Sequence, residues 1–231
     1  MVASAKCQKV EVELGCYKIG KREKQLLKSP SGWFNDTLID LYSIHLRDSI
    51  LKKYRGEKLP NIHVVSSLIG GPYIANTMHH PIYVPHNREQ PDLIIMPVTI
   101  NSHWILFIYE WATKKVHYFN SLLGHFTKDT EKGFYRRVRD FLLEYYHTDK
   151  SEKLQSVRYG CQAAKQQSDA VNCGVFLLHH LEVFLGVYVA HYVAVNAKTL
   201  ESEVYALELN KSVIDPNEYR HKMYSTYFRY L

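Results

Sequence analysis

The chain has 231 residues, of which 46% are hydrophobic and 23% are charged, and its formal net charge is +6. These values fit an ordinary soluble globular protein with one large domain, or with one domain and an extension. A solvated lysine-rich surface explains the basic balance more simply than a nucleic-acid partner, and no glycine-rich phosphate loop accompanies it. We therefore expect no nucleic-acid partner and no nucleotide chemistry.

The apolar runs and the cysteines indicate the cellular compartment of the protein. No apolar run approaches the roughly 20 residues of a membrane span, and residues 1–15 lack a hydrophobic signal core. The cysteines, Cys7, Cys16, Cys161 and Cys173, show no metal-type pairing and no dense disulfide framework. We expect a monomer without a membrane anchor, metal or cofactor, in the cytoplasm or nucleus, or in the host cell if the source is a pathogen.

Residues 1–31 are expected to form a basic lead segment before a main domain at residues 32–231. Residues 10–14 alternate in the manner of a strand, and lysine and arginine are frequent from residue 18 to residue 28. A flexible lead and an added strand both fit this pattern. After Trp33, Asn35 or Asp36 can cap a long helix whose apolar positions recur at helical spacing as far as residue 51.

A sheet is predicted in the middle of the chain. Residues 62–69 fit a short strand or the start of a helix, and the insertion at residues 74–88 is typical of a loop near a binding site. Residues 93–100 and 104–111 form two apolar runs that predict buried strands, and a turn at Lys114 and Lys115 leads into a third strand ending at Asn120.

Helices dominate the remainder. Helical patterns cover about residues 130–147, the apolar segment after residue 173 and residues 196–209, with a short strand near Val157. The helix after Cys173 is expected to reach Leu185, and the residues from there to residue 195 are too apolar to be a linker. Asp215 and Pro216 are typical of a cap and a first helical position, and they predict a last helix through Tyr230. The predicted class is α+β, with helices around a central mixed sheet.

One segment places a cysteine at the start of an apolar helix. Polar residues lead into Cys173 and Gly174, and an apolar run follows to Leu185. A helix N-terminus carries unpaired backbone N–H groups and a partial positive charge, which favour a thiolate over a thiol. Cys173 is therefore a candidate nucleophile, although a buried structural cysteine explains this segment equally well.

Three further residues complete a candidate site. His103 starts a predicted strand and can act as the base for Cys173. Asn120 ends the next strand, where a hairpin would bring it beside His103 to accept a hydrogen bond from one ring nitrogen. Gln167 can donate to an oxyanion together with the backbone N–H of Cys173. Each residue also has an ordinary alternative, as a strand-start histidine, a turn asparagine and a surface glutamine.

Four short motifs stand in order along the chain: W-F-N-D at residues 33–36, H-W at 103–104, Y-F-N-S at 118–121 and Q-Q-x5-C-G at 166–174. They resemble the W-L-N-D, H-W, Y-Y-D-S and Q-Q-x5-C-G motifs of the ubiquitin-like-protein proteases, the Ulp/sentrin-specific (SUMO) protease family. The resemblance runs from about Trp33 to the C-terminus, where YRHKMYSTYF is similar to the family's last helix.

This resemblance implies a papain-like fold in circularly rearranged order. It also implies a catalytic triad of Cys173 as nucleophile, His103 as general base and Asn120 as orienting group, with Gln167 in the oxyanion hole. The family cleaves after a Gly-Gly sequence and releases SUMO or a related modifier from a precursor or a target lysine.

The same resemblance assigns substrate binding to Trp33, Trp104 and Asp36. The two tryptophans would enclose the Gly-Gly tail in a narrow tunnel, because only glycine lets a backbone pass between two indole faces. Two positions depart from the family's pattern, since Asn120 and Asn172 stand where it usually has aspartate. Cys-His-Asn triads nevertheless work in papain-like enzymes, where a low-pKa thiolate forms an ion pair with the histidine.

We therefore expect a thiol peptidase or isopeptidase whose partner is a ubiquitin-like protein or its conjugates, with SUMO as first choice and ubiquitin or another modifier as second. Alternatives are a polyprotein-processing Gly-Gly endopeptidase, a clan-related acetyltransferase and a pseudoprotease that binds a modifier without cutting it. The presence of Cys173, His103 and Gln167 together argues against the pseudoprotease.

Overall fold

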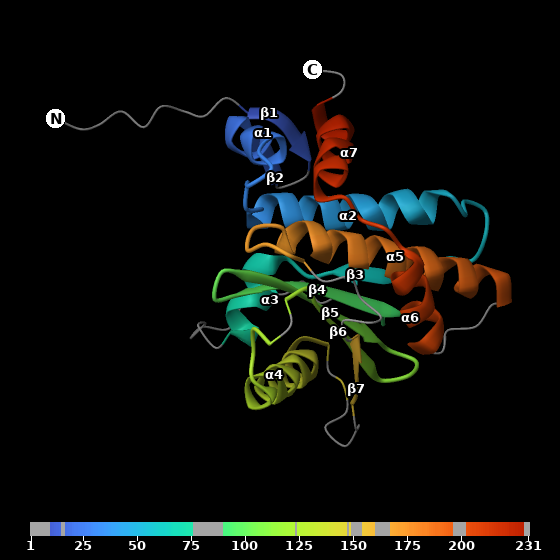
Figure 1. Ribbon diagram of the computed structural model, residues 1–231. Helices are drawn as coiled ribbons and strands as arrows, with labels where there is room; N and C mark the ends of the chain where they lie inside the picture. The colour runs from blue at the N-terminus through green and yellow to red at the C-terminus, as the bar shows by residue number, and fades with distance from the viewer. Residues whose placement is uncertain are drawn as a thin grey trace.

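The computed structural model describes residues 10–14, 17–75, 90–122, 124–146, 148, 154–159, 167–195 and 202–228. Five strands form a mixed sheet, which lies in the middle of the molecule (Figure 1). Their order across the sheet is β3 (Ile62–Val64), β4 (Leu93–Ile100), β5 (His103–Glu110), β6 (Lys115–Asn120) and β7 (Gln155–Tyr159). The mixed sheet was expected from the sequence, as were β4, β5, β6 and a strand near Val157, whereas the sequence of residues 62–69 fits either a strand or a helix start.

The register of the sheet sets the position of Asn120 relative to His103. Strands β4, β5 and β6 form antiparallel pairs, whereas β3 and β7 add at the two edges in parallel. Asn120 at the end of β6 pairs with Ile105 near the start of β5. Because side chains two residues apart point to the same face of a strand, this register sets Asn120 diagonally next to His103.

Strand β5 is buried along its whole length because both faces of the sheet are covered. Leu106 and Ile108 belong to one hydrophobic core, and Phe107 and Tyr109 belong to a second core on the other face. This is why the segment has a continuous apolar run rather than an alternating pattern. The buried central strand gives the start of β5 a rigid anchor.

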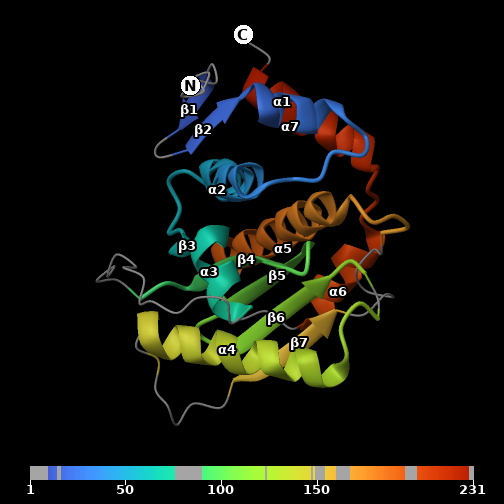
Figure 2. The same ribbon diagram turned by 90° about the vertical axis from the view of Figure 1, so that its left-hand side faces the viewer.

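Helices cover the two faces separately (Figure 2). Helix α5 (Cys173–Val195) lies on the first face and packs against α2 (Asp36–Lys52). Helices α3 (Ser67–Ile74) and α4 (Lys128–Tyr146) lie on the second face. Asn35 is the residue that caps α2, since its side-chain oxygen accepts a hydrogen bond from the N–H of Leu38 at 3.1 Å.

The first and last described elements of the chain lie together on the outer side of α2. A two-stranded ribbon of β1 (Val10–Leu14) and β2 (Tyr17–Gly20) leads into α1 (Lys21–Lys28), which lies beside the last helix, α7 (Pro216–Phe228) (Figure 1). Ile19 and Leu27 are buried in the same core as α2 and α5. The predicted boundary at residue 31 remains a prediction, but residues 17–28 contribute to the main core.

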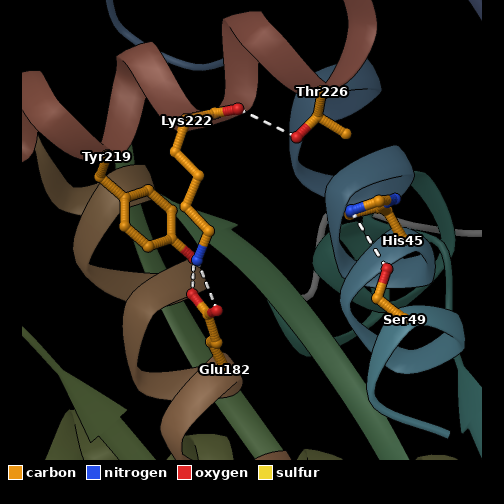
Figure 3. Close-up of polar contacts among 6 residues, drawn as sticks. All are labelled: His45, Ser49, Glu182, Tyr219, Lys222 and Thr226. Carbon is orange, nitrogen blue, oxygen red and sulfur yellow. Dashed lines mark hydrogen bonds and ion pairs between the residues drawn. The ribbon is translucent and has the colours of Figure 1, made fainter. Parts of the chain in front are cut away.

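Helix α7 is held on α5 by polar contacts. Glu182 of α5 accepts hydrogen bonds from the Tyr219 hydroxyl at 3.0 Å and from the Lys222 ammonium at 2.5 Å (Figure 3). Asp215 caps α7 as expected, because its carboxylate accepts hydrogen bonds from the N–H groups of Asn217 and Glu218. Helix α6 (Ser202–Lys211) precedes this cap.

Helix α5 differs from its prediction. It continues through Gly186 to Val195 and is, within the described residues, the one helix long and apolar enough to cross a membrane. The expectation that no apolar segment reaches this length is therefore wrong. Its most apolar 18 residues are 72% buried inside the protein, as in a core helix. Most of the insertion at residues 74–88 lies outside the described residues.

Candidate active site

Cys173 is the first residue of α5, and its residue surface is only 1% exposed. Burial raises the pKa of its thiol above the ordinary value. The backbone N–H groups of Trp104, Gly174 and Cys173 itself and the indole of Trp33 act in the opposite direction, but burial outweighs them. The expected thiolate is thus not favoured in this state, and Cys173 is a thiol at neutral pH.

Gly174 is required at the next position by packing. A Cβ atom there would lie 3.0 Å from Cβ of Phe34 and 3.1 Å from Cδ1 of Ile39. A side chain at this position would therefore push the first turn of α5 and the start of α2 apart by a few tenths of an ångström. The Trp104 indole N–H donates a 2.8 Å hydrogen bond to the backbone carbonyl of Phe34, which fixes the same segment to β5.

His103 and Asn120 are in direct contact. The Nε2 atom of His103 lies 2.8 Å from Oδ1 of Asn120, and His103 is 3% exposed. Burial lowers the pKa of His103, with the neighbouring His125 ring acting in the same direction and the Asn120 bond against it. At neutral pH the imidazole is therefore uncharged and able to accept a proton.

The orientation of the Asn120 amide determines which ring nitrogen carries the proton. The backbone N–H of Leu122 donates to Oδ1 of Asn120 at 3.0 Å, and Nδ2 of Asn120 donates to the Tyr118 hydroxyl at 3.2 Å. A backbone N–H can only donate, so the atom that it meets is the amide oxygen. His103 must then donate from Nε2, which makes Nδ1 the basic nitrogen.

Gln167 is buried beside the end of β6. Its Oε1 accepts a 2.6 Å hydrogen bond from the Ser121 hydroxyl, and its backbone N–H donates to the Ser121 carbonyl at 2.9 Å. Its Nε2 donates to the carbonyl of Asp169. An amide nitrogen carries two hydrogens, so this bond uses one of its two donors. Gln166, the other glutamine of the motif, lies outside the described residues.

The two tryptophans do not form an open tunnel in this state. The rings of Trp33 and Trp104 are stacked on each other, with centroids 5.6 Å apart and an interplanar angle of 23°. A backbone between them would need about 7 Å, which is two carbon contacts of ~3.5 Å. Trp104 is 1% exposed, whereas Trp33 is half-buried and more able to move.

Asp36 lies in the first turn of α2, where its carboxylate accepts a 3.4 Å hydrogen bond from the Ser67 hydroxyl of α3. Its position is thus at the contact between α2 and α3. Of the described residues, no group of three or more His, Cys, Asp or Glu side chains is arranged to hold a metal ion. Cys7, Cys16 and Cys161 lie outside the described residues, so the expectation of no metal or cofactor stays a prediction.

Sequence reasoning missed Asp169 and Arg220, which hold the loop that precedes Cys173. Asp169 accepts hydrogen bonds from the N–H groups of Val171 and Asn172 at 2.8 Å each, which shapes the loop into α5. Arg220 of α7 binds the Asn172 side chain and is 2% exposed. The only signal for Asp169 was an aspartate four residues before a helix start. Arg220 had none, since arginine is usually exposed.

Comparison with known proteins supplies further findings. A family model described as the Ulp1 protease family, C-terminal catalytic domain, matches residues 72–218. The probable ubiquitin-like-specific protease 2B of Arabidopsis thaliana is 26% identical over 205 residues, which cover 72% of this chain and 21% of the relative. The chain therefore spans about a fifth of the length of that curated relative.

Solved structures show the same fold. A structure described as the de-sumoylating protease has a TM-score of 0.61 and 17% identity, with 91% of this chain and 85% of that chain covered. The C-terminal Ulp1 protease domain in complex with Smt3, the yeast ortholog of SUMO, has a TM-score of 0.58 and 15% identity, with 96% and 90% covered. These likenesses confirm the expected rearranged papain-like α+β fold.

Proposed function

The chain belongs to the Ulp1 protease family of cysteine proteases, and on this premise we propose that it cleaves after the C-terminal Gly-Gly of a ubiquitin-like modifier. Cys173 is the nucleophile, His103 the general base and Asn120 its orienting group. The observation that carries the proposal is the contact between His103 and Asn120. His103 starts strand β5, and the backbone N–H of the next residue, Trp104, interacts with the Cys173 sulfur.

The first chemical step follows from the protonation states of the resting site. His103 Nδ1 takes the thiol proton of Cys173 while Nε2 keeps its hydrogen bond to Asn120. The sulfur forms a bond to the carbonyl carbon of the last glycine, and the carbonyl electrons move to its oxygen. Because Asn120 is neutral, it orients the imidazolium that forms but stabilises its charge less than an aspartate would.

The oxyanion and the leaving amine use the remaining groups. The backbone N–H of Cys173 and the second hydrogen on Nε2 of Gln167 donate to the oxyanion. When the oxyanion collapses, the carbon–nitrogen bond breaks and His103 gives its proton to the leaving amine, which is a lysine side chain or a backbone amine. Water, activated by His103, then hydrolyses the thioester and releases the modifier.

The relatives support the choice of substrate. The Arabidopsis relative is named as a ubiquitin-like-specific protease, and the solved Ulp1 domain is bound to Smt3. A buried thiol beside two stacked indoles admits only a thin extended chain, which favours a glycine pair before the scissile bond. A SUMO-type modifier is therefore the first choice, and ubiquitin or another modifier the second.

Cleavage of fusion proteins tests this proposal. Each substrate carries SUMO, ubiquitin or another modifier, its Gly-Gly and a reporter protein, and matched fusions have the two glycines replaced by alanines. We expect cleavage of the SUMO fusion after the second glycine, loss of cleavage in Cys173→Ala, and no cleavage of the alanine fusion. Modifier binding without cleavage of any fusion would instead support the pseudoprotease alternative.

A further inference from the structure

Arg220 is a buried cation that contacts Asn172, the residue immediately before Cys173. Its Nη2 and Nε atoms donate to Oδ1 of Asn172 at 2.8 and 3.3 Å, and Nη1 donates to the carbonyl of Leu26 at 3.0 Å. Its guanidinium lies 4.5 Å from the centre of the Phe34 ring. Its direct partners are thus neutral, although a buried charge usually has an ionised partner.

The contact changes what Asn172 does at the start of α5. An asparagine immediately before a helix normally accepts a hydrogen bond from a first-turn N–H group. Here Oδ1 of Asn172 accepts from Arg220, and Nδ2 of Asn172 donates to Asp169 at 2.8 Å. The N–H groups of Cys173 and Gly174 are thereby left to interact with the sulfur.

Helix α7 holds Arg220 firmly in this position. Tyr219 and Lys222, on either side of Arg220 in the sequence, both bind Glu182 of α5 (Figure 3). Asp215 caps the start of the same helix. The guanidinium is therefore fixed relative to α5, whose first residue is Cys173.

Charge links Arg220 to the nucleophile as well. Burial lowers the pKa of Arg220 to about 10, and the charges of Asp169 and Cys173 act to raise it. A thiolate at Cys173 is stabilised by the same attraction. Asp169 is the carboxylate whose charge acts on Arg220, and Lys28, His221 and Tyr224 line a pocket together with Arg220.

We propose that Arg220 is a positioning residue for Cys173. Arg220 holds the Asn172 side chain away from the first turn of α5 and places a fixed positive charge near the Cys173 sulfur. This inference rests on the proposed function of Cys173 as nucleophile. It explains how a thiol that burial keeps protonated can become a thiolate when His103 removes its proton. A neutral residue at position 172 leaves the charge of Arg220 available to the sulfur.

The test is the pH dependence of iodoacetamide alkylation at Cys173, followed by mass spectrometry of the peptide that contains it. Arg220→Gln should raise the apparent pKa of Cys173 and slow alkylation at pH 7 by about tenfold, which corresponds to one pKa unit. Arg220→Lys keeps the charge and should restore most of the rate. Lys211→Gln, which removes an exposed cation from α6, should leave the profile unchanged.

The outcomes separate this inference from the proposed function, because alkylation needs no modifier substrate. A folded Arg220→Gln protein with the wild-type pH profile would overturn the role of Arg220, whether or not a modifier is cleaved. If Arg220→Gln does not fold, Arg220→Lys still decides. Because one ammonium cannot replace a bidentate fork, Arg220→Lys should slow alkylation of Cys173 at pH 7 by about twofold to threefold, and a wild-type alkylation profile would contradict the proposal.

Discussion

His103 donates a hydrogen bond from Nε2 to Oδ1 of Asn120 at 2.8 Å, and the backbone N–H of Leu122 donates to the same oxygen at 3.0 Å. The second bond prevents the amide from turning its nitrogen towards the histidine. The backbone after β6 thus selects the tautomer of His103 that leaves Nδ1 as the base. A neutral asparagine is sufficient for this orienting role.

Replacement of Asn120 by alanine removes the acceptor that selects the tautomer. We expect Asn120→Ala to lower kcat by about tenfold or more, since the wrong tautomer of a triad histidine is costly, while modifier binding stays nearly intact. Steady-state kinetics and binding to a Cys173→Ala background give the two readouts. An unchanged turnover rate would remove Asn120 from the triad.

Asn120→Asp introduces a charge without losing the acceptor oxygen. A carboxylate next to His103 favours the imidazolium and raises the low pKa of His103. Because the neutral imidazole is the base, the acidic limb of the kcat/KM profile should move from below 6.5 to a higher pH. A limb that stays in place in the folded variant would show that His103 does not set it.

The stacked tryptophans must separate before a substrate tail can pass. Trp33 is half-buried and is expected to move, whereas the buried Trp104 is held by its bond to Phe34. Trp33→Ala should raise KM by about tenfold, because it removes one aromatic wall worth ~1 kcal/mol or more. The rate of Cys173 alkylation should change by a smaller factor than KM. Trp111→Ala, in the turn after the far end of β5, is the matched control. Equal losses in KM and alkylation would contradict this role.

The central sheet was predictable because each of its inner strands is buried on both faces. Residues 93–100 and 104–111 therefore appear as continuous apolar runs, and the hairpin between β5 and β6 follows from the two lysines at its turn. The first and last helices of the main domain were predictable from their caps, Asn35 and Asp215. Local chemistry was enough for these elements.

Other features depend on tertiary contacts that leave no local pattern. The helix predicted after Cys173 reached only Leu185, but packing keeps α5 helical through Gly186 to Val195. Ile19 and Leu27 lie in a basic segment without an apolar pattern of helical or strand spacing, yet both are buried. The raised pKa of Cys173 follows from burial beneath Trp33 and Trp104, which outweighs the helix N-terminus considered from sequence alone.

Two glycines of α5 offer a matched pair for the packing of the nucleophile helix. Gly174→Ala places a Cβ 3.0 Å from Phe34 and should lower the free energy of unfolding by about 1–3 kcal/mol. Gly186→Ala meets no atom within 4 Å and should raise it by up to about 1 kcal/mol. Urea unfolding measures both. Equal effects would show that the start of α5 is not tightly packed.

Buried histidines predict a loss of stability in acid. Burial lowers the pKa values of His103, His117 and His179 below 6.5 in the folded protein. As pH falls below about 6.5 the unfolded chain binds protons that the folded protein does not, so the free energy of unfolding decreases, by up to ~1.4 kcal/mol per pH unit for each histidine.

His179→Gln can keep a hydrogen bond to Ser212, which His179 makes at 3.0 Å, while it removes one titrating group. Urea unfolding between pH 7 and pH 5 should therefore show a shallower loss in this variant. His221→Gln, at an exposed position on α7, should retain the wild-type slope. Identical slopes in all three proteins would mean that His179 titrates alike in the folded and unfolded states.

The most direct test of the central claim is covalent capture by modifiers that carry a C-terminal propargyl or vinyl sulfone group in place of the scissile bond. Incubation with SUMO-type, ubiquitin and other modifier probes should give one stable adduct, with SUMO favoured, and peptide mass spectrometry should place the bond on Cys173. Cys173→Ala should form none. No adduct with any modifier probe, or an adduct on a different residue, would contradict the assignment of Cys173 as the nucleophile of a modifier protease.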